Sequence, residues 1–372
     1  FTTKADDLDV WVRNYAAGTG RDPRQDFVVV GTEKPHPESI WPTDVLGPRR
    51  VYRFNVLQEE YRRSGGLSPN ITNMLLATMS HGASAVSRSD PYWENALRQL
   101  LNNAIELAAR ASELSKGVAE IQLADLLAIV QSAAQSVGEL GTKRFRQGRC
   151  FAALSIIDSR REQIDMAAYS DALMTSAYWL REYPSLSERV RSIIVSTLTS
   201  KTDALLRNPL RELLFGESDP QAAPINCFEP DAVTGRPKII IVDLPLKLYG
   251  EVGRDAQVLY KVAWQKEADR RAKRIREGQG SATPAFLWAD EAHHFLTKAD
   301  ALFQSTARSA RVGTVYLTQN LPGMFAAIGE HATHSLLGSL QTKVFHTNGD
   351  AETNHWAERV IGTAHTPTQS IN

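Results

Sequence analysis

Two acidic residues in a row follow an apolar run in the last third of the chain. The run covers residues 286–289, and the acids are Asp290 and Glu291. At the end of a buried strand, the first acid could hold Mg²⁺ through its water ligands, and the second could act as the base that activates an attacking water. The same pair would also suit the N-cap and first turn of a helix. The sequence leaves both interpretations open.

An amide and two arginines accompany the acidic pair. Gln319 follows the next apolar run, and an uncharged group that both donates and accepts hydrogen bonds can sense a γ-phosphate or position a water. Arg308 and Arg311 are three residues apart, so they share a helical face and are candidate arginine fingers for the site of a neighbouring subunit. The simpler interpretations are a turn residue for Gln319 and an exposed basic face for the arginines.

Further polar residues lie at other candidate strand ends. Asp243 ends the apolar run 238–243, and Lys4 follows a short run at the N-terminus, so both are candidates for nucleotide binding. A lysine in such a place is more often a solvated loop charge. His293 and His294 follow the acidic pair, but without an H-E-x-x-H motif or a nearby Cys/His cluster we expect helical residues near the nucleotide rather than zinc ligands.

The apolar pattern predicts the elements that must position these side chains. Strands are expected at 26–30, 238–243, 285–289 and 312–317, and helices at 6–17 and 256–277. This alternation is typical of an α/β fold. Because ligands bind beyond the carboxyl ends of parallel strands, Asp243, Asp290, Glu291 and Gln319 are expected to share one edge of a single sheet.

The middle of the chain has a different pattern. Between residues 70 and 208 no strand-like run stands out, and apolar residues recur at helical spacing. Asp90 and Pro91 are typical of a helix start, and an apolar stripe follows them at Trp93, Leu97, Leu100, Leu101 and Ile105. We therefore expect an all-α domain at 70–208, inserted between two parts of a nucleotide domain at 1–69 and 209–372.

Overall composition indicates the cellular compartment of the chain more clearly than the molecule that it binds. Among 372 residues, Lys+Arg and Asp+Glu both number 42, so net charge neither supports nor excludes DNA binding. The basic stretch 261–276 would be a solvated face or the lining of a nucleic-acid pore. Cys150 and Cys227 show no metal-ligand spacing, and no run approaches the roughly 20 apolar residues that span a bilayer, so a cytosolic chain is expected.

One expected motif is missing. The sequence contains no G-x-x-x-x-G-K-S/T, the Walker A loop that cradles the β- and γ-phosphates of a nucleotide. The chain as printed would therefore not hold a nucleotide in the usual way.

The order and spacing of the motifs resemble the TraG/TraD-type coupling ATPases of conjugation and type IV secretion, within the HerA/FtsK-like P-loop superfamily. The matching segments are residues 3–6, 54–57, 65–70, 90–96, 241–245 with 253–254, 290–291, 311–313, 319, and 343–350 with 361–362. The resemblance implies a RecA-like P-loop nucleotide domain with an inserted all-α domain, in a hexameric ring around DNA. In this family the Walker A loop and a membrane anchor would precede Phe1.

The resemblance also implies an activity. We expect an ATP- and Mg²⁺-dependent motor that translocates DNA or a DNA–protein substrate, with type IV secretion or relaxosome proteins as partners, in the cytoplasm or at the cytoplasmic face of the inner membrane. Asp290, Lys4 and Asp243 would bind the nucleotide and its metal. Two alternatives stay open: a catalytically inactive scaffold that recruits secretion substrates, and a related DNA pump in segregation, end processing or defence.

Overall fold

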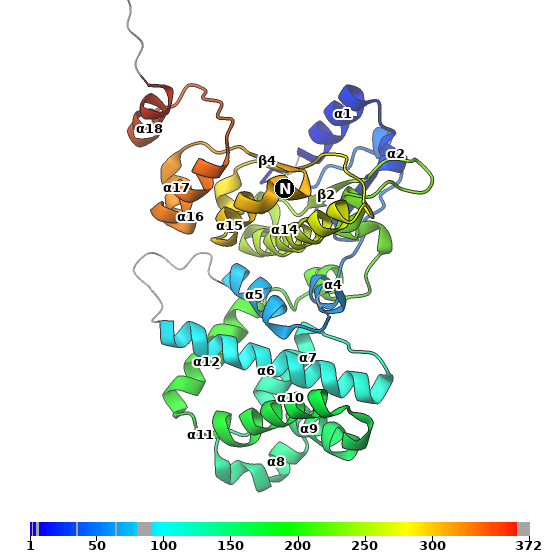
Figure 1. Ribbon diagram of the computed structural model, residues 1–372, viewed down its shortest axis with the longest axis vertical. Coiled ribbons are helices and arrows are strands. Elements are labelled where there is room, and N and C mark those ends of the chain that lie inside the picture. The colour runs from blue at the N-terminus through cyan, green and yellow to red at the C-terminus, as the bar shows by residue number, and fades with distance from the viewer. Residues whose placement is uncertain (2, 5–6, 35, 64, 80–90, 363–372) are drawn as a thin grey trace, which may run out of the picture.

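A computed structural model describes residues 1, 3–4, 7–34, 36–63, 65–79 and 91–362. Two short pairs of strands lie on one side of a long helix, α14 (Leu246–Arg276), and a group of helices lies on its other side (Figure 1). The predicted α/β character is present, although helices dominate. Among the described residues, no helix is both long enough and apolar enough to cross a membrane.

The strands form two separate parallel pairs. β1 (Phe27–Gly31) pairs with β2 (Ile239–Asp243), and β3 (Ala285–Ala289) pairs with β4 (Val312–Tyr316). All four strands lie within two residues of their predicted positions. The expectation of a single sheet is wrong for the described residues, because no ladder joins β2 to β3.

Both pairs pack on α14 through one hydrophobic core. Val28, Val30 and Val242 from the first pair join Leu287 and Ala289 from the second in this cluster, together with buried residues of α14. Helix α1 (Asp7–Thr19) covers the opposite face of the first pair, where Leu8 and Val12 pack on Phe27 and Val29. The first pair is therefore enclosed on both faces, as parallel strands usually are.

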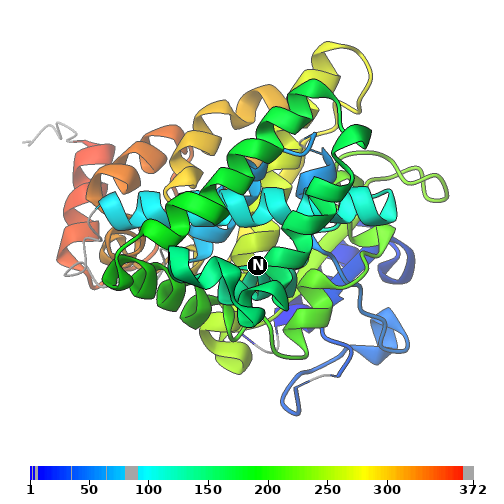
Figure 2. The same ribbon diagram turned by 90° about the horizontal axis from the view of Figure 1, so that it is seen from below.

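From Ser68 to Phe215 the described residues form helices joined by turns and loops, with no strand among them, and the view from below shows these helices in front of the rest (Figure 2). The predicted stripe of α6 is buried at Leu97, Leu100, Leu101 and Ile105, whereas Asp90 lies outside the described residues. Helix α5 packs both on α14, next to the strands, and on α6 of the helical part. Because this contact joins the two parts, the domain boundaries at 69/70 and 208/209 remain predictions. The helices are α5 (Ser68–Met79), α6 (Pro91–Lys116), α7 (Leu123–Ser132), α8 (Lys143–Arg146), α9 (Arg149–Ser159), α10 (Met166–Ala177), α11 (Tyr183–Ser185), α12 (Glu188–Thr202) and α13 (Leu210–Phe215).

Short helices complete the part around the strands. They are α2 (Pro23–Asp26), α3 (Thr43–Leu46), α4 (Val56–Arg63), α15 (Ala299–Thr306), α16 (Leu321–Ile328), α17 (Glu330–Ser339) and α18 (Ala351–Ile361), with 3₁₀ turns η6 (Ala292–His294) and η7 (Ala307–Ala310). Helices α16 and α17 pack around a small second core with Leu321, Met324 and Leu336.

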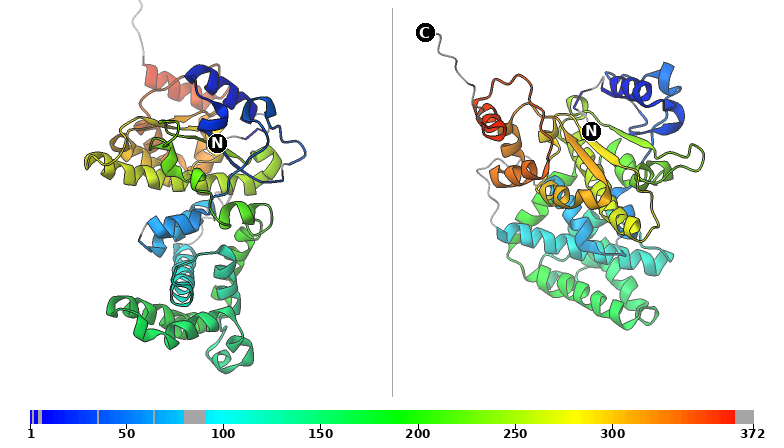
Figure 3. Two further views of the ribbon diagram at one scale, coloured as in Figure 1. Left: turned by 90° about the vertical axis from the view of Figure 1, so that its right-hand side faces the viewer. Right: turned by 45° about the horizontal axis from the view of Figure 1, so that its top comes forward.

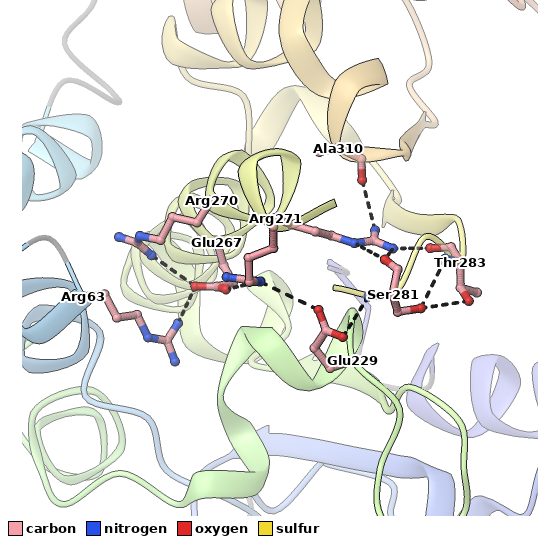
Figure 4. Close-up of polar contacts among 9 residues, drawn as sticks. Arg63, Glu229, Glu267, Arg270, Arg271, Ser281, Thr283 and Ala310 are labelled. Atoms are coloured by element: carbon pink, nitrogen blue, oxygen red, sulfur yellow. Dashed lines mark hydrogen bonds and ion pairs between the residues drawn. The ribbon is translucent and has the colours of Figure 1, made fainter. Parts of the chain in front are cut away.

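The basic stretch of α14 lies largely inside the protein. Arg271 is fully buried, and its guanidinium donates to the backbone carbonyls of Ser281, Thr283 and Ala310 (Figure 4). It also lies 5.0 Å from the ring centroid of Phe228. Arg271 thus fastens α14 to the segments that enter β3 and β4.

The neighbouring arginines surround a buried carboxylate. Glu267 accepts from Arg63 at 3.2 Å, Arg270 at 3.2 Å and Arg274 at 2.7 Å, and its side chain is only 2% exposed (Figure 4). Of the basic residues in this stretch, only Lys273 and Arg276 are exposed. The stretch is therefore an internal ion network between α14 and α4, neither the solvated face nor the pore lining that the sequence suggested.

Candidate functional site

The acidic pair and the amide meet where β3 and β4 end. Backbone hydrogen bonds continue past the ladder, from Leu317 N to Ala289 O at 3.0 Å and from Ala292 N to Leu317 O at 2.7 Å. The segments after the two strands are thereby held side by side. Across this junction, Gln319 Nε2 donates to Glu291 Oε1 at 2.7 Å.

The backbone of Glu291 is in the left-handed region, with φ 49° and ψ 49°. This conformation costs a residue with a Cβ roughly 1–2 kcal/mol, so surrounding contacts must hold it. Its Oε1 accepts from Gln319, but its Oε2 is buried and has no hydrogen-bond partner among the described residues. One carboxylate oxygen is thus fixed and the other is free to accept.

Lys4 and Asp290 belong to the same edge. Lys4 Nζ lies 3.6 Å from Asp290 Oδ2, with the two side chains 47% and 22% exposed. The charge of Asp290, followed by that of Asp7, raises the pKa of Lys4. Asp290 N donates to Phe1 O at 3.2 Å, which ties the N-terminal segment to the end of β3. A cation and two carboxylates therefore face one another beside Gln319.

The structure adds three polar residues to this edge. His293 Nδ1 lies 3.2 Å from Thr318 Oγ1 and 3.7 Å from Glu291 Oε2, and Asn348 Nδ2 donates to Gln319 O at 2.6 Å. His293 was expected near the site, but Thr318 and Asn348 were not singled out. The available signals were the position of Thr318 directly before Gln319 and the place of Asn348 in the segment 343–350 that matches the coupling ATPases.

A buried carboxylate, that of Asp300, links the residues at this edge to α14. Asp300 is 1% exposed and accepts from Lys261 at 2.5 Å, Gln265 at 2.7 Å, the Tyr316 hydroxyl at 2.9 Å and Thr297 N at 2.6 Å. Burial opposes ionisation, but Lys261 and these hydrogen bonds hold the pKa of Asp300 below its ordinary value. Since Tyr316 ends β4 and Thr297 follows η6, Asp300 connects both sides of the Glu291–Gln319 contact to α14.

Asp243 lies apart from this cluster. It ends β2, in the other strand pair, and is 4% exposed. Burial raises its pKa to about 6, against the opposing charge of Arg49. Within the described residues it makes no hydrogen bond or ion pair with Asp290, Glu291 or Gln319. The expected single cluster is therefore not formed, because β2 and β3 do not pair.

The two candidate arginine fingers lie at the opposite end of β4. Arg308 is in η7, and Arg311 directly precedes β4 with φ 51° and ψ 44°. Both side chains are exposed. A five-residue strand spans about 16 Å, so neither arginine reaches the Glu291–Gln319 contact of its own chain. A role in catalysis would require the site of a neighbouring chain.

The residues fit a magnesium–nucleotide complex better than a metal held by protein ligands alone. Among the described residues, no group of three or more His, Cys, Asp or Glu is placed to hold a metal. Mg²⁺ keeps several waters and usually binds one or two carboxylates together with substrate phosphates. Asp290 supplies such a carboxylate, and the free Oε2 of Glu291 can accept a hydrogen bond from a water beside it.

Comparison with known proteins returns no match to any family model or to any curated protein. Three solved structures of the bacterial conjugative coupling protein TrwBΔN70 or TrwB are similar to the chain, each at 13% sequence identity. The unbound form has a TM-score of 0.45, with 87% of this chain and 57% of that chain covered. The form with sulphate and the complex with the GTP analogue GDPNP have TM-scores of 0.43 and 0.42, each with 87% of this chain and 58% of that chain covered.

These structures are coupling proteins, the kind of protein that the sequence motifs resemble. The chain spans little more than half of their length. At this identity and similarity they assign no residue of the site, which is judged on its own geometry.

Proposed function

We propose that this chain is part of an ATP-driven P-loop motor of the coupling-protein type, with a RecA-like nucleotide domain that translocates DNA or a DNA–protein substrate. The observation that carries the proposal is the contact of Glu291 with Gln319 beside Asp290, at the carboxyl ends of two adjacent parallel strands. Nucleotides bind at such ends in α/β proteins. The order of the motifs, which resembles that of coupling ATPases, supports the same assignment.

Each residue of the cluster has a role that follows from its chemistry. ATP would supply the phosphoryl group, and bound Mg²⁺ would neutralise part of the charge on its phosphates. Asp290 would hold the metal through its waters, and Lys4 would offset the negative charge of the phosphates. Glu291 would take the proton of the attacking water at Oε2, while Gln319 keeps that carboxylate oriented and responds to the γ-phosphate.

The proposal extends to assembly and setting. Arg308 or Arg311 would act in the site of the adjacent subunit, as expected for a ring, and a hexamer around DNA suits a translocation motor. Secretion or relaxosome proteins would deliver the substrate at the cytoplasmic face of the membrane. This setting rests on the resemblance of the motifs.

The test is ATP hydrolysis by the full-length protein, with and without single- and double-stranded DNA. A general base contributes about 10²–10⁴-fold, so Glu291→Gln is expected to lower turnover by at least about 100-fold. Glu277→Gln, at the exposed end of α14, is the matched control and should leave turnover unchanged. Unchanged turnover in Glu291→Gln would remove Glu291 from its role. A folded wild-type protein without any turnover would favour the scaffold alternative.

A further inference from the structure

The two oxygens of the Glu291 carboxylate have different surroundings. Oε1 accepts from Gln319 at 2.7 Å, whereas Oε2 is buried and has no hydrogen-bond partner among the described residues. The imidazole of His293 faces this second oxygen, with Nδ1 3.7 Å from Oε2. That separation is too long for a hydrogen bond, so Oε2 stays open although a ring nitrogen lies beside it.

The tautomer of His293 follows from its other neighbour, Thr318. The Thr318 hydroxyl donates to Asn320 O at 3.3 Å, and because a hydroxyl has a single proton, its oxygen acts as an acceptor toward His293. His293 Nδ1 lies 3.2 Å from Thr318 Oγ1. Both groups that face Nδ1, this hydroxyl oxygen and the Glu291 carboxylate, are thus acceptors. In the neutral ring the proton is therefore on Nδ1 rather than on Nε2.

Other groups hold the imidazole of His293 close to both acceptors. The ring of His294 lies 4.2 Å away between centroids, and the backbone of Gly323 in α16 is so near that a Cβ there would lie 3.3 Å from Cγ of His293. Helix α16 contacts η6, and the right view of Figure 3 shows the helices that follow β4 beside the strands. Within this space, a small rotation of the ring moves Nδ1 from Thr318 Oγ1 to Glu291 Oε2.

We propose that Thr318 is a positioning residue for Glu291: by accepting the Nδ1–H of His293, it keeps this N–H away from Oε2, the oxygen that takes the proton of the attacking water. The proposal rests on the proposed hydrolytic role of Glu291. Without the Thr318 hydroxyl, the Nδ1–H turns to Oε2 and occupies it. The two consecutive residues after β4 thus control one carboxylate, because Gln319 fixes Oε1 and Thr318 keeps Oε2 open.

The first test measures ATP hydrolysis by variants of the full-length protein. Thr318→Val keeps the shape of the side chain but cannot accept the N–H, so kcat should fall by about 10- to 100-fold, the effect of one hydrogen bond to a charged group, while KM for ATP stays unchanged. Thr318→Ser keeps the hydroxyl and should retain the wild-type kcat. Thr342→Val, at an exposed position after α17, is the matched control.

The double variant Thr318→Val/His293→Ala identifies the cause of the loss. If His293 blocks Oε2, its removal should return kcat to the value of His293→Ala alone. A double variant as slow as Thr318→Val would mean that Thr318 acts without His293, which contradicts the proposal. Full turnover in Thr318→Val, together with lost turnover in Glu291→Gln, would also overturn it but would leave the proposed function intact.

Nuclear magnetic resonance with ¹⁵N-labelled histidine tests the geometry without any turnover. Long-range ¹H–¹⁵N correlations, assigned with the His293→Gln variant, show which ring nitrogen carries the proton. In the wild type, Nδ1 of His293 should carry it, and in Thr318→Val this proton should shift downfield as it bonds the carboxylate. A wild-type ring with its proton on Nε2 alone would refute the proposal, because no Nδ1–H would then be present to reach Glu291.

Discussion

The Glu291 carboxylate is held in place by its own backbone and by Gln319. Among the described residues, the two non-glycine positions with positive φ are Glu291 and Arg311, and both were selected from the sequence as catalytic candidates. Strained backbone of this kind concentrates at functional sites, where it orients a side chain at a cost borne by the rest of the fold. For Glu291 the result is a buried oxygen without a hydrogen-bond partner among the described residues, next to an exposed lysine and a second acid.

Asp243 gives a pH prediction at the residue scale. Its pKa rises from 3.8 to about 6 on folding, so the folded state binds more protons between these values and its stability falls as the pH rises through them. Asp243→Asn removes the buried charge. It should increase the free energy of unfolding by about 1–3 kcal/mol at pH 8 and leave it nearly unchanged at pH 4.

Urea denaturation at pH 4, 6 and 8 measures this difference. Asp158→Asn, on the exposed end of α9, is the control for the substitution itself. A difference between Asp243→Asn and the wild type that is constant across the three pH values would contradict buried ionisation of Asp243.

At the scale of single elements, α14 connects the strands to the helices that precede β2, through its contact with α5. Its apolar side supports both strand pairs, and its charged side chains pair with residues brought in by α4 and by the loop before β2. Glu60 of α4, for example, accepts from Arg270 at 2.5 Å. A charge that is buried with its partner stabilises one arrangement of these elements, because removal of either partner leaves the other unpaired.

The network of α14 predicts a clear difference between two glutamates of the same segment. Glu267→Gln removes the buried carboxylate that three arginines share and leaves Arg63 without its acidic partner, whereas Arg270 keeps Glu60 and Arg274 keeps Glu229. The free energy of unfolding should fall by about 2–4 kcal/mol. Glu277→Gln, whose side chain is 43% exposed beside Lys273, should change it by less than about 0.5 kcal/mol. Urea denaturation at neutral pH provides both values. Equal effects would mean that Glu267 is not needed to neutralise the network.

At the scale of the whole molecule, the candidate catalytic groups lie at two ends of one strand. Gln319 and Glu291 are beyond the carboxyl end of β4, and the exposed Arg308 and Arg311 are at its amino end. In one chain, each end of β4 therefore carries only part of the proposed set of catalytic groups. A ring in which the arginine end of one subunit meets the acidic end of the next would complete every site, as the proposed motor requires.

This arrangement predicts recovery of activity in mixed assemblies. Full-length Arg311→Ala and Glu291→Gln proteins should each lose ATP hydrolysis. When they are mixed, some sites combine the intact Glu291 of one subunit with the intact Arg311 of its neighbour, so a substantial fraction of wild-type turnover should return. If mixing gives no recovery although native mass spectrometry detects mixed oligomers, Arg311 does not act across the subunit boundary; Arg308→Ala is tested in the same way.

The sequence by itself determined the elements and the chemistry of the edge. Strands of a parallel sheet appear as continuous apolar runs, so β1, β2, β3 and β4 were located to within two residues, although only β1 is buried along its whole length. Their polar ends, at Asp290, Glu291 and Gln319, stand out because a run of this kind must stop where the strand leaves the core. The helical spacing of α6 identified its buried stripe for the same reason of local periodicity.

Only the tertiary structure decided which of these residues meet. Strand pairing places Glu291 against Gln319, separates Asp243 from both, and sets Arg311 about a strand length away. Arg271 looked like one charge in a basic run, but it is buried because carbonyl groups from two other segments surround it. Such contacts depend on the order in which strands and helices pack, and local patterns of residues carry little information about that order.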